Sequence, residues 1–158
     1  MEWDKKIASV VDAVLADYHQ DRDIDRLESF RNPDKDAIID IIDKLRRIVF
    51  PGYFRDKNYR SYNSRNQLSV LLEDTMINLT HQIALVFEST GESAETAKTH
   101  AEEVCMVFFG ALPQVRAMVQ TDLQAAYDGD PAATGMAEII FAYPGVFAIT
   151  VYRLAHVL

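Results

Sequence analysis

The chain has 158 residues, of which 49% are apolar and 25% are charged, and its formal net charge at pH 7 is −8. This length and composition predict a single globular domain with a substantial core. The excess of negative charge disfavours nucleic acid and anionic membranes as partners, because both are themselves negative.

Export and membrane insertion are not expected either. The longest apolar run, residues 139–152, is too short to span a bilayer and is interrupted by Pro144-Gly145. The opening Met-Glu-Trp-Asp-Lys-Lys lacks the basic start and apolar core of a signal peptide. The single cysteine, Cys105, has no partner for a disulfide within the chain. We therefore expect a cytoplasmic protein.

Two helices are predicted in the first third of the chain. Apolar residues recur at helical spacing over residues 3–19, which is typical of an amphipathic helix. Residues 20–31 carry charges of both signs and predict a loop with room for one helical turn. Asn32-Pro33-Asp34 predicts the next start, with a capping residue followed by proline. That helix should continue to about Val49 and end at Pro51-Gly52.

The loop over residues 50–62 mixes aromatic with basic side chains. Such a mixture can stack on single-stranded nucleic acid. With a net charge of −8, we favour rings that hold the loop to the core and charges that face solvent. A protein contact is a third interpretation, because aromatic residues and arginine are enriched at interfaces.

The longest predicted helix covers residues 66–88 and is apolar on more than one side. Such a helix is either central in the fold or covered by a partner chain. Thr90-Gly91 predicts its C-terminal cap, and Ser93 predicts the cap of the following helix. Gly110 and Pro113 separate that helix from another, which should reach the turn at residues 128–130.

Two further helix starts are predicted near the end of the chain. Asp130-Pro131 fits an N-cap followed by proline at the first helical position. Tyr143-Pro144-Gly145 starts the last helix, which has no C-cap glycine or polar tail before Leu158. We therefore expect further chain beyond Leu158. The pattern as a whole predicts an all-α fold of six to eight helices paired as antiparallel hairpins.

The residues that usually bind metals do not form a metal-binding pattern. The histidines are His19, His81, His100 and His156, and none belongs to a known ligand motif. His100 and Glu103 form one isolated pair, which is more typical of a solvated surface. Asp128-Gly129-Asp130 opens like a calcium loop, but the remaining ligands are missing. No metal is therefore expected, and Cys105, set among apolar residues, is predicted to be buried and inert.

Asp122 lies at the edge of the apolar face of its helix. A partly buried carboxylate needs a partner, and Arg153 is the best candidate because its guanidinium matches a carboxylate. We interpret this pair as structural rather than catalytic. His156 lies on an apolar helix, where a lone histidine is usually a hydrogen-bonded core or interface residue.

Several short motifs carry a family resemblance. They are Phe50-Pro-Gly-Tyr-Phe54, Asp122-Leu-Gln-Ala, Asp130-Pro-Ala, Tyr143-Pro-Gly and Tyr152-Arg-Leu-Ala-His156. In order and spacing they resemble the N-terminal helical region of serine O-acetyltransferases. The resemblance covers most of the chain and is strongest after Thr121. It implies one N-terminal helical domain over residues 1–158, with an oligomerisation part at 1–110 and a segment at 111–158 that leads to the next domain.

The resemblance also implies a function and a site. The family transfers acetyl from acetyl-CoA to L-serine for cysteine synthesis. Its catalytic histidine and its acetyl-CoA site lie in a hexapeptide-repeat β-helix that is not part of this chain, so no catalytic residue is expected here. Asp130 and Pro131 would contact serine, although the arginine that often precedes the aspartate is replaced by Gly129. The helical domain would also join copies into a homo-oligomer.

Two other interpretations stay open. One is a free-standing helical interaction module without catalytic activity. The other is a bundle enzyme with its own metal site.

Overall fold

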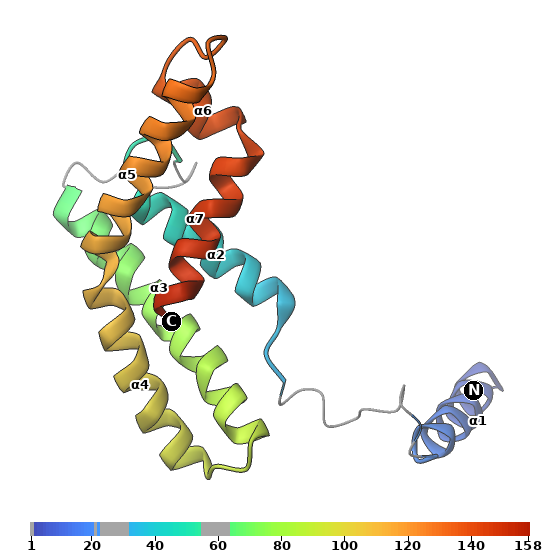
Figure 1. The fold of residues 1–158 in the computed structure, drawn as a ribbon. Helices are drawn as coiled ribbons and strands as arrows, with labels where there is room; N and C mark the ends of the chain where they lie inside the picture. Colours follow the sequence, from blue (N-terminus) through green and yellow to red (C-terminus); the bar gives the residue numbers. More distant parts are fainter. Residues whose placement is uncertain (1, 21, 23–31, 55–63) are drawn as a thin grey trace. The chain divides into compact units, whose positions relative to one another are not determined.

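The structure is a computed structural model, and it describes residues 2–20, 22, 32–54 and 64–158. The described residues form seven α-helices and no β-strand, which confirms the predicted all-α fold of six to eight helices (Figure 1). The helices are α1 (Glu2–Tyr18), α2 (Lys35–Val49), α3 (Ser64–Ser89), α4 (Ala94–Gly110), α5 (Leu112–Gly129), α6 (Met136–Ala142) and α7 (Pro144–Val157).

The chain divides into two compact units, Met1–Asn32 and Pro33–Leu158. The subdivision predicted from the sequence lies between residues 110 and 111. At that point, inside the second unit, α4 and α5 meet at a bend of 46°. The functional subdivision at this bend stays a prediction.

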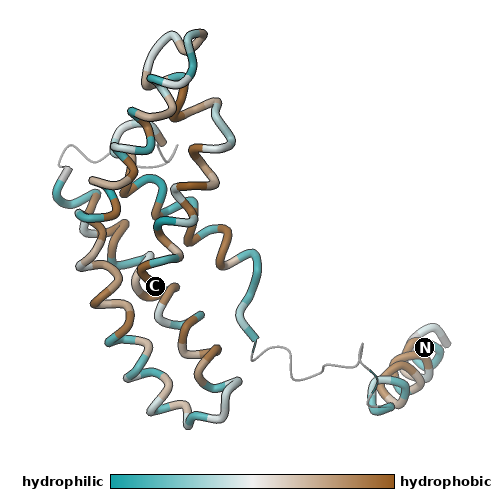
Figure 2. The backbone as a smooth tube through the Cα atoms, in the orientation of Figure 1, coloured by the Kyte–Doolittle hydropathy of each residue, from teal (hydrophilic) through white to brown (hydrophobic). Residues whose placement is uncertain are grey.

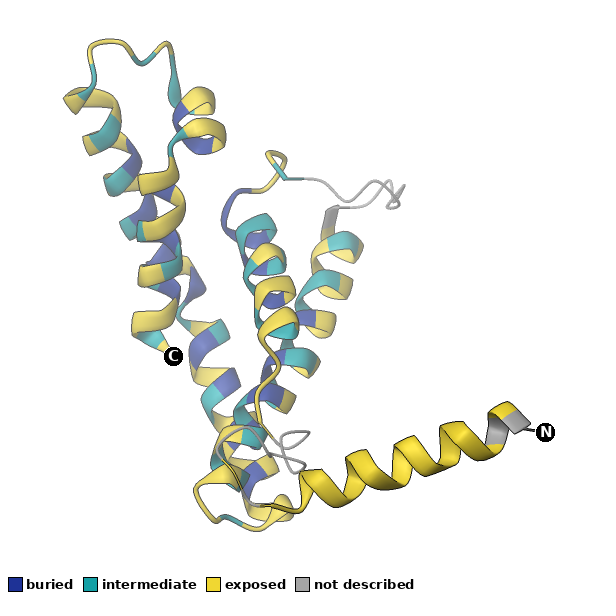
Figure 3. Cartoon of the chain, turned by 90° about the vertical axis from the view of Figure 1, so that its right-hand side faces the viewer, coloured by how far each residue is buried: buried dark blue, intermediate teal, exposed yellow. Residues whose placement is uncertain are grey.

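The first unit contains α1, which confirms the helix predicted over residues 3–19. Its apolar side chains are all exposed, from 76% for Trp3 to 40% for Val14. The described residues of α1 are exposed along its length (Figure 3). The predicted loop over residues 20–31 lies almost wholly outside the described residues.

The start of α2 differs from the prediction. Asp34 is its N-cap, with its carboxylate oxygens accepting the N–H groups of Asp36 at 3.2 Å and Ala37 at 3.3 Å. A carboxylate also interacts favourably with the positive end of the helix dipole, which the amide of Asn32 cannot match. Pro33 therefore precedes the cap instead of following it. The predicted end at Val49 is confirmed.

The predicted turn between α3 and α4 is confirmed in detail. The N–H of Gly91 bonds to the carbonyl of Glu88 at 3.0 Å, and the N–H of Glu92 bonds to the carbonyl of Phe87 at 3.2 Å. Gly91 has φ of 103°, a conformation that glycine adopts without steric cost. The Ser93 hydroxyl then accepts the N–H of Thr96 at 3.2 Å and caps α4. Together these contacts reverse the chain into an antiparallel hairpin (Figure 1).

One hydrophobic core runs through the second unit. Each of its helices carries both apolar and polar residues (Figure 2). The buried residues, which are mostly apolar, lie on the faces that the helices turn towards one another (Figure 3). The fully buried members include Ala97, Ala101 and Phe108 of α4, Val115 of α5 and Ile139 of α6. Small side chains at Ala97 and Ala101, both 0% exposed, allow α3 to approach α4 closely.

Polar contacts connect α2 to its neighbours. The ammonium of Lys44 lies 2.6 Å from a carboxylate oxygen of Asp74 on α3. The side-chain carbonyl of Gln82 on α3 accepts the backbone N–H of Asp34 at 2.7 Å. On the other side, Arg116 of α5 donates to the carbonyl of Val49 at 3.2 Å. These bonds satisfy groups at both ends of α2.

Aromatic rings fix the beginning of the loop that follows α2. Phe50 is buried, and Phe54 packs against the core. The guanidinium carbon of Arg46 lies 4.3 Å from the ring centroid of Phe54 and 4.5 Å from that of Phe147, so one cation bridges α2 and α7. This agrees with the interpretation that rings hold the loop to the core, as far as residue 54. Residues 55–63 lie outside the described part of the chain.

Within the described residues, no single helix is both long and apolar enough to cross a membrane. Two pairs of helices, α4 with α5 and α6 with α7, meet the length and composition criteria only when each pair is taken together. They bend by 46° and 77° respectively.

Candidate functional site

The predicted pair of Asp122 and Arg153 is present and joins α5 to α7. Arg153 donates from Nε to Asp122 Oδ2 at 3.1 Å and from its terminal Nη2 to Oδ1 at 3.0 Å. This is the two-pronged geometry that suits guanidinium and carboxylate. The side chains are 19% and 30% exposed, and the hydrogen bond to Asp122 raises the pKa of Arg153. The contact orients the two helices that flank the following loop.

Asp130 does not begin a helix, so the predicted N-cap is wrong. It is the C-cap that follows the last residue of α5, and the next helix begins only at Met136. The Asp130 carboxylate still accepts the N–H of Ala132 at 2.9 Å, and its carbonyl accepts the N–H of Ala133 at 3.1 Å. These bonds make one tight turn with Pro131 at its second position. The turn does not continue into a helix, because residues 133–135 are not helical and α6 begins only after Gly135, which has φ of 166°.

The second oxygen of Asp130 meets Tyr143, the residue just before α7. The Tyr143 hydroxyl donates to Asp130 Oδ2 at 2.5 Å. This bond, followed by that from Ala132, lowers the pKa of Asp130. The same bond to Asp130 raises the pKa of Tyr143 to about 12. At neutral pH the carboxylate is therefore ionised and the phenol is protonated, with each group fixing the other.

A second carboxylate closes the other end of the loop. Glu138 Oε2 accepts the Thr134 hydroxyl at 2.7 Å and the Thr134 backbone N–H at 2.8 Å. These two bonds, in that order, lower the pKa of Glu138. The contact resembles a capping box, in which an acidic residue in the first turn reaches back to the chain entering the helix. Residues 130–138 thus form a short loop held at both ends, which we call the clamped loop.

The other polar residues singled out from the sequence lie elsewhere. His156 is exposed and stacks on Tyr152, with ring centroids 5.7 Å apart, so it is not a core residue. His100 lies 3.0 Å from a carboxylate oxygen of Glu92, so the structure pairs it with that residue. Cys105 is 1% exposed, and burial raises the pKa of its thiol, which agrees with an inert cysteine.

No cluster of three or more potential metal-binding side chains occurs among the residues that the structure describes. Asp128, considered above as part of a calcium loop, accepts a hydrogen bond from Gln124 at 2.8 Å.

Sequence reasoning found Asp122, Asp130 and Arg153 but missed two partners. Tyr143 was interpreted only as part of a helix start, whereas in the structure its hydroxyl bonds to Asp130, thirteen residues earlier. Glu138 was not singled out, because it follows Thr134 by four residues and not by the three of a capping box. Pro131, predicted to contact serine, is exposed beside Asp130, and its role stays a prediction.

The residues that the structure describes thus define an all-α domain with an acidic loop held in place between α5 and α7. The family model described as "Serine acetyltransferase, N-terminal" matches residues 60–151. The serine acetyltransferase, plasmid, of Synechococcus elongatus is 35% identical over 131 residues, covering 78% of this chain and 41% of that protein.

Two solved structures from Entamoeba histolytica are also similar. Native serine acetyltransferase 1 has a TM-score of 0.60 and 27% identity, covering 98% of this chain and 53% of that one. Serine acetyltransferase isoform 3, solved in complex with cysteine, has a TM-score of 0.59 and 26% identity, covering 74% of this chain and 38% of that one. The chain belongs to the serine acetyltransferase family, of which it represents the N-terminal helical domain. It spans about half the length of these relatives or less.

Proposed function

We propose that this chain belongs to an enzyme that transfers acetyl from acetyl-CoA to the hydroxyl of L-serine. In that enzyme it would form one wall of the serine pocket and join the subunits into an oligomer. The family membership supports the reaction. The observation that supports a role for this region is the Asp130 carboxylate, which is ionised and held through both oxygens. A fixed negative charge is the feature that a serine ammonium group requires.

The clamped loop leaves Asp130 able to bind an ammonium. Each carboxylate oxygen can accept more than one hydrogen bond, and each already accepts one from within the chain. The remaining acceptor positions have fixed directions because the carboxylate cannot rotate without breaking a bond. A preoriented charge binds its ligand with a smaller loss of conformational freedom than a mobile one. Asp130 would therefore form one wall of a serine pocket, with Pro131 limiting the loop's movement.

We assign the acetyl-transfer step to a part of the enzyme other than residues 1–158. Acetyl transfer to a hydroxyl needs a general base, and the described residues bring no histidine to the clamped loop. The chain alone is expected to be inactive. The same proposal places the enzyme in the cytoplasm and gives it a role in cysteine biosynthesis.

Self-association is the second part of the proposed role. In the second unit, α3 leaves Ile77 64% exposed and Val86 45% exposed, and α4 leaves Met106 and Val107 more than 60% exposed. Apolar side chains of this size on a hairpin favour contact with another copy of the chain. Sedimentation of the chain at micromolar concentration should show a dimer or larger species, and a monomer alone would contradict this part.

The enzyme assignment is tested by an assay of the full-length protein that carries this N-terminus. Purified protein, acetyl-CoA and L-serine should release the thiol of CoA, which a thiol reagent detects. Glycine, which lacks the hydroxyl acceptor, should release none. Absence of serine-dependent thiol release from a folded protein would contradict the proposal.

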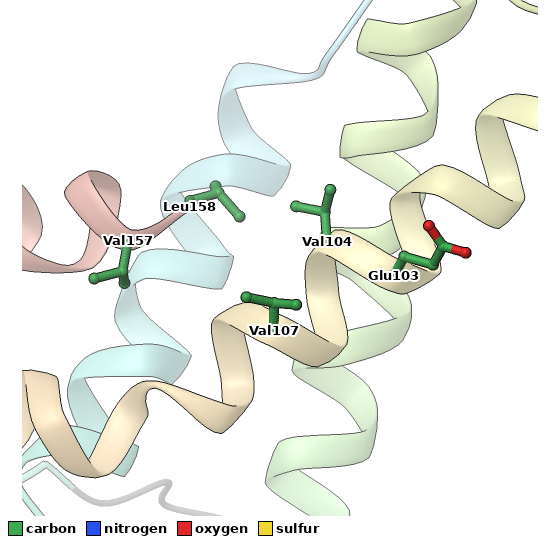
Figure 4. A pocket seen from close by; sticks show the side chains of 5 residues that line it. All are labelled: Glu103, Val104, Val107, Val157 and Leu158. Carbon is green, nitrogen blue, oxygen red and sulfur yellow. The ribbon is translucent and has the colours of Figure 1, made fainter.

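One observation favours a non-enzymatic alternative, a free-standing interaction module. An open depression lies between α4 and the end of α7, lined by Val104, Val107, Val157, Leu158 and Glu103 (Figure 4). Its walls are mostly apolar, as in a surface that receives another protein segment. This alternative predicts a chain that binds a partner protein while the full-length protein releases no CoA. The assay above therefore separates the two functions.

A further inference from the structure

We propose that Tyr143 is the positioning residue for the ammonium-binding carboxylate, and that its hydroxyl sets the affinity of the site for L-serine through Asp130. This inference rests on the proposed function, because it assigns a role to Tyr143 in the same serine pocket. It concerns the residue between α6 and α7, which holds the carboxylate in place across the clamped loop.

The geometry gives Tyr143 a function beyond packing. Its hydroxyl takes one oxygen of Asp130 at 2.5 Å, and the N–H of Ala132 takes the other at 2.9 Å. With only the bond from Ala132, the carboxylate would be free to turn about its side-chain torsion. With both, the plane of the carboxylate and the direction of its open acceptor positions are fixed. Tyr143 therefore determines where a bound ammonium has to lie.

The choice of a phenol as donor has a chemical reason. A tyrosine hydroxyl keeps its proton through the physiological range, and here the pKa is raised to about 12 by the bond to Asp130. A histidine in its place would change charge near neutral pH, and a lysine would neutralise the carboxylate. Tyr143 stabilises the ionised form of Asp130 without adding a positive charge that competes with the ligand.

Tyr143 is also anchored independently of Asp130. It packs against the core, and its carbonyl accepts the N–H groups of Val146 at 3.1 Å and Phe147 at 3.4 Å in the first turn of α7. Asp130, by contrast, lies where α5 has already ended. The more firmly held residue thus orients the less firmly held one, which is the relation expected of a supporting contact.

The matched control comes from the other end of the clamped loop. Thr134 donates its hydrogen bonds to Glu138, whereas the Asp130 carboxylate accepts from Ala132 and Tyr143. Thr134→Val removes its hydroxyl bond while leaving its backbone N–H bond to Glu138. This substitution loosens the same loop without touching the carboxylate, so it reports the purely structural effect of losing one hydroxyl.

The test compares three variants of the full-length enzyme: Tyr143→Phe, Thr134→Val and Asp130→Asn. Tyr143→Phe should raise KM for L-serine about five- to thirtyfold while changing kcat less than about twofold, because it weakens ground-state binding. Thr134→Val should keep KM for serine within about twofold of the parent value. KM for acetyl-CoA should stay unchanged in both.

The outcomes separate this inference from the proposed function. If Asp130→Asn impairs serine use and Tyr143→Phe behaves like the parent, the role of Tyr143 is contradicted and that of Asp130 stands. If Asp130→Asn leaves serine kinetics unchanged, the proposed role of the loop in binding serine is contradicted, and the inference about Tyr143 falls with it. Equal losses in Tyr143→Phe and Thr134→Val would mean that the loop is merely loosened, and would overturn the inference.

A second measurement applies if Tyr143→Phe does not fold. The chain has seven tyrosines, and 3-fluorotyrosine incorporation gives each a fluorine signal that titrates in a milder pH range than tyrosine itself. The signal of residue 143 should titrate at higher pH than the exposed tyrosines in the parent chain. It should approach them in Asp130→Asn. A Tyr143 signal that titrates with the others in the parent chain would overturn the inference.

Discussion

The α3–α4 hairpin and the α5–α7 segment are held together in different ways. In the hairpin, the helices meet through small buried residues such as Ala97 and Ala101, while Met106 and Val107 remain exposed. In the α5–α7 segment, specific polar pairs reinforce the core: Asp122 with Arg153, and Asp130 with Tyr143. Close packing along the helices and a hydrogen-bonded turn at their end hold the first region, and packing with polar side-chain pairs holds the second.

The difference separates two kinds of task. Apolar packing is insensitive to the exact direction of side chains and leaves an outward face free for another copy of the chain. Directed hydrogen bonds fix the positions of particular atoms, which a ligand-binding loop requires. The clamped loop therefore lies in the region with directed contacts.

The largest effect is expected in the core beneath the clamped loop. Ile139 of the short helix α6 is 0% exposed. Ile139→Ala should lower the free energy of unfolding by about 2–5 kcal/mol, measured by urea denaturation, because it removes buried methyl groups and leaves a cavity. Lys98→Ala, on the exposed side of α4, should change it by less than about 0.5 kcal/mol. Similar losses at the two positions would contradict the burial pattern.

The hairpin should be sensitive to added volume rather than to lost polar contacts. Ala101→Leu places a large side chain where the helices pack most closely and should cost about 1–3 kcal/mol in unfolding free energy. Ala125→Leu, on an exposed face of α5, serves as the matched control and should cost less than about 0.5 kcal/mol. A neutral Ala101→Leu would mean that α3 and α4 are not closely packed there.

The ion pair between α5 and α7 should contribute a smaller amount. Asp122→Ala leaves the partly buried Arg153 without its partner. We expect the melting temperature to fall by about 2–8 °C. Asp128→Ala removes an exposed carboxylate from the same helix and should leave the melting temperature nearly unchanged. If thermal melts of Asp122→Ala and the parent coincide, the structural role of Asp122 is wrong.

The smallest effect is a dependence of stability on alkaline pH. The pKa of Tyr143 is raised to about 12 when folded, against about 10 when unfolded. Because the folded pKa is the higher one, the stabilisation by this phenol is fully present below pH ~10 and is lost as pH rises towards ~12. The stability gap between the parent and Tyr143→Phe, measured by urea midpoints, should therefore shrink over this range. A gap that stays constant would contradict the Asp130 bond.

The sequence predicted the helices well because their signals are local. Gly91 and Ser93 close and open helices through bonds to residues a few positions away, and both are confirmed. The prediction for Asp130 failed for a related reason: an aspartate followed by proline also starts a tight turn, and here the chain leaves that turn and forms no helix before Met136. The residues next to Asp130 do not distinguish a helix start from a tight turn.

The candidate site was only half predictable. Asp122 and Arg153 were paired because a partly buried carboxylate needs a partner and the guanidinium of arginine matches its geometry. Tyr143 as the partner of Asp130 depends on how the loop and α6 fold back, which is a tertiary arrangement. No local pattern reveals which of seven tyrosines reaches the carboxylate.

The central claim, that Asp130 binds the ammonium of serine, is tested most directly by Asp130→Asn in the full-length enzyme. Asparagine has the same shape and can still accept the N–H of Ala132, so the melting temperature should stay near that of the parent. The lost negative charge should lower kcat/KM for L-serine by about ten- to a hundredfold, while KM for acetyl-CoA stays unchanged. An unchanged kcat/KM for serine in a normally folded Asp130→Asn enzyme would contradict the account and leave Asp130 as a residue of the turn alone.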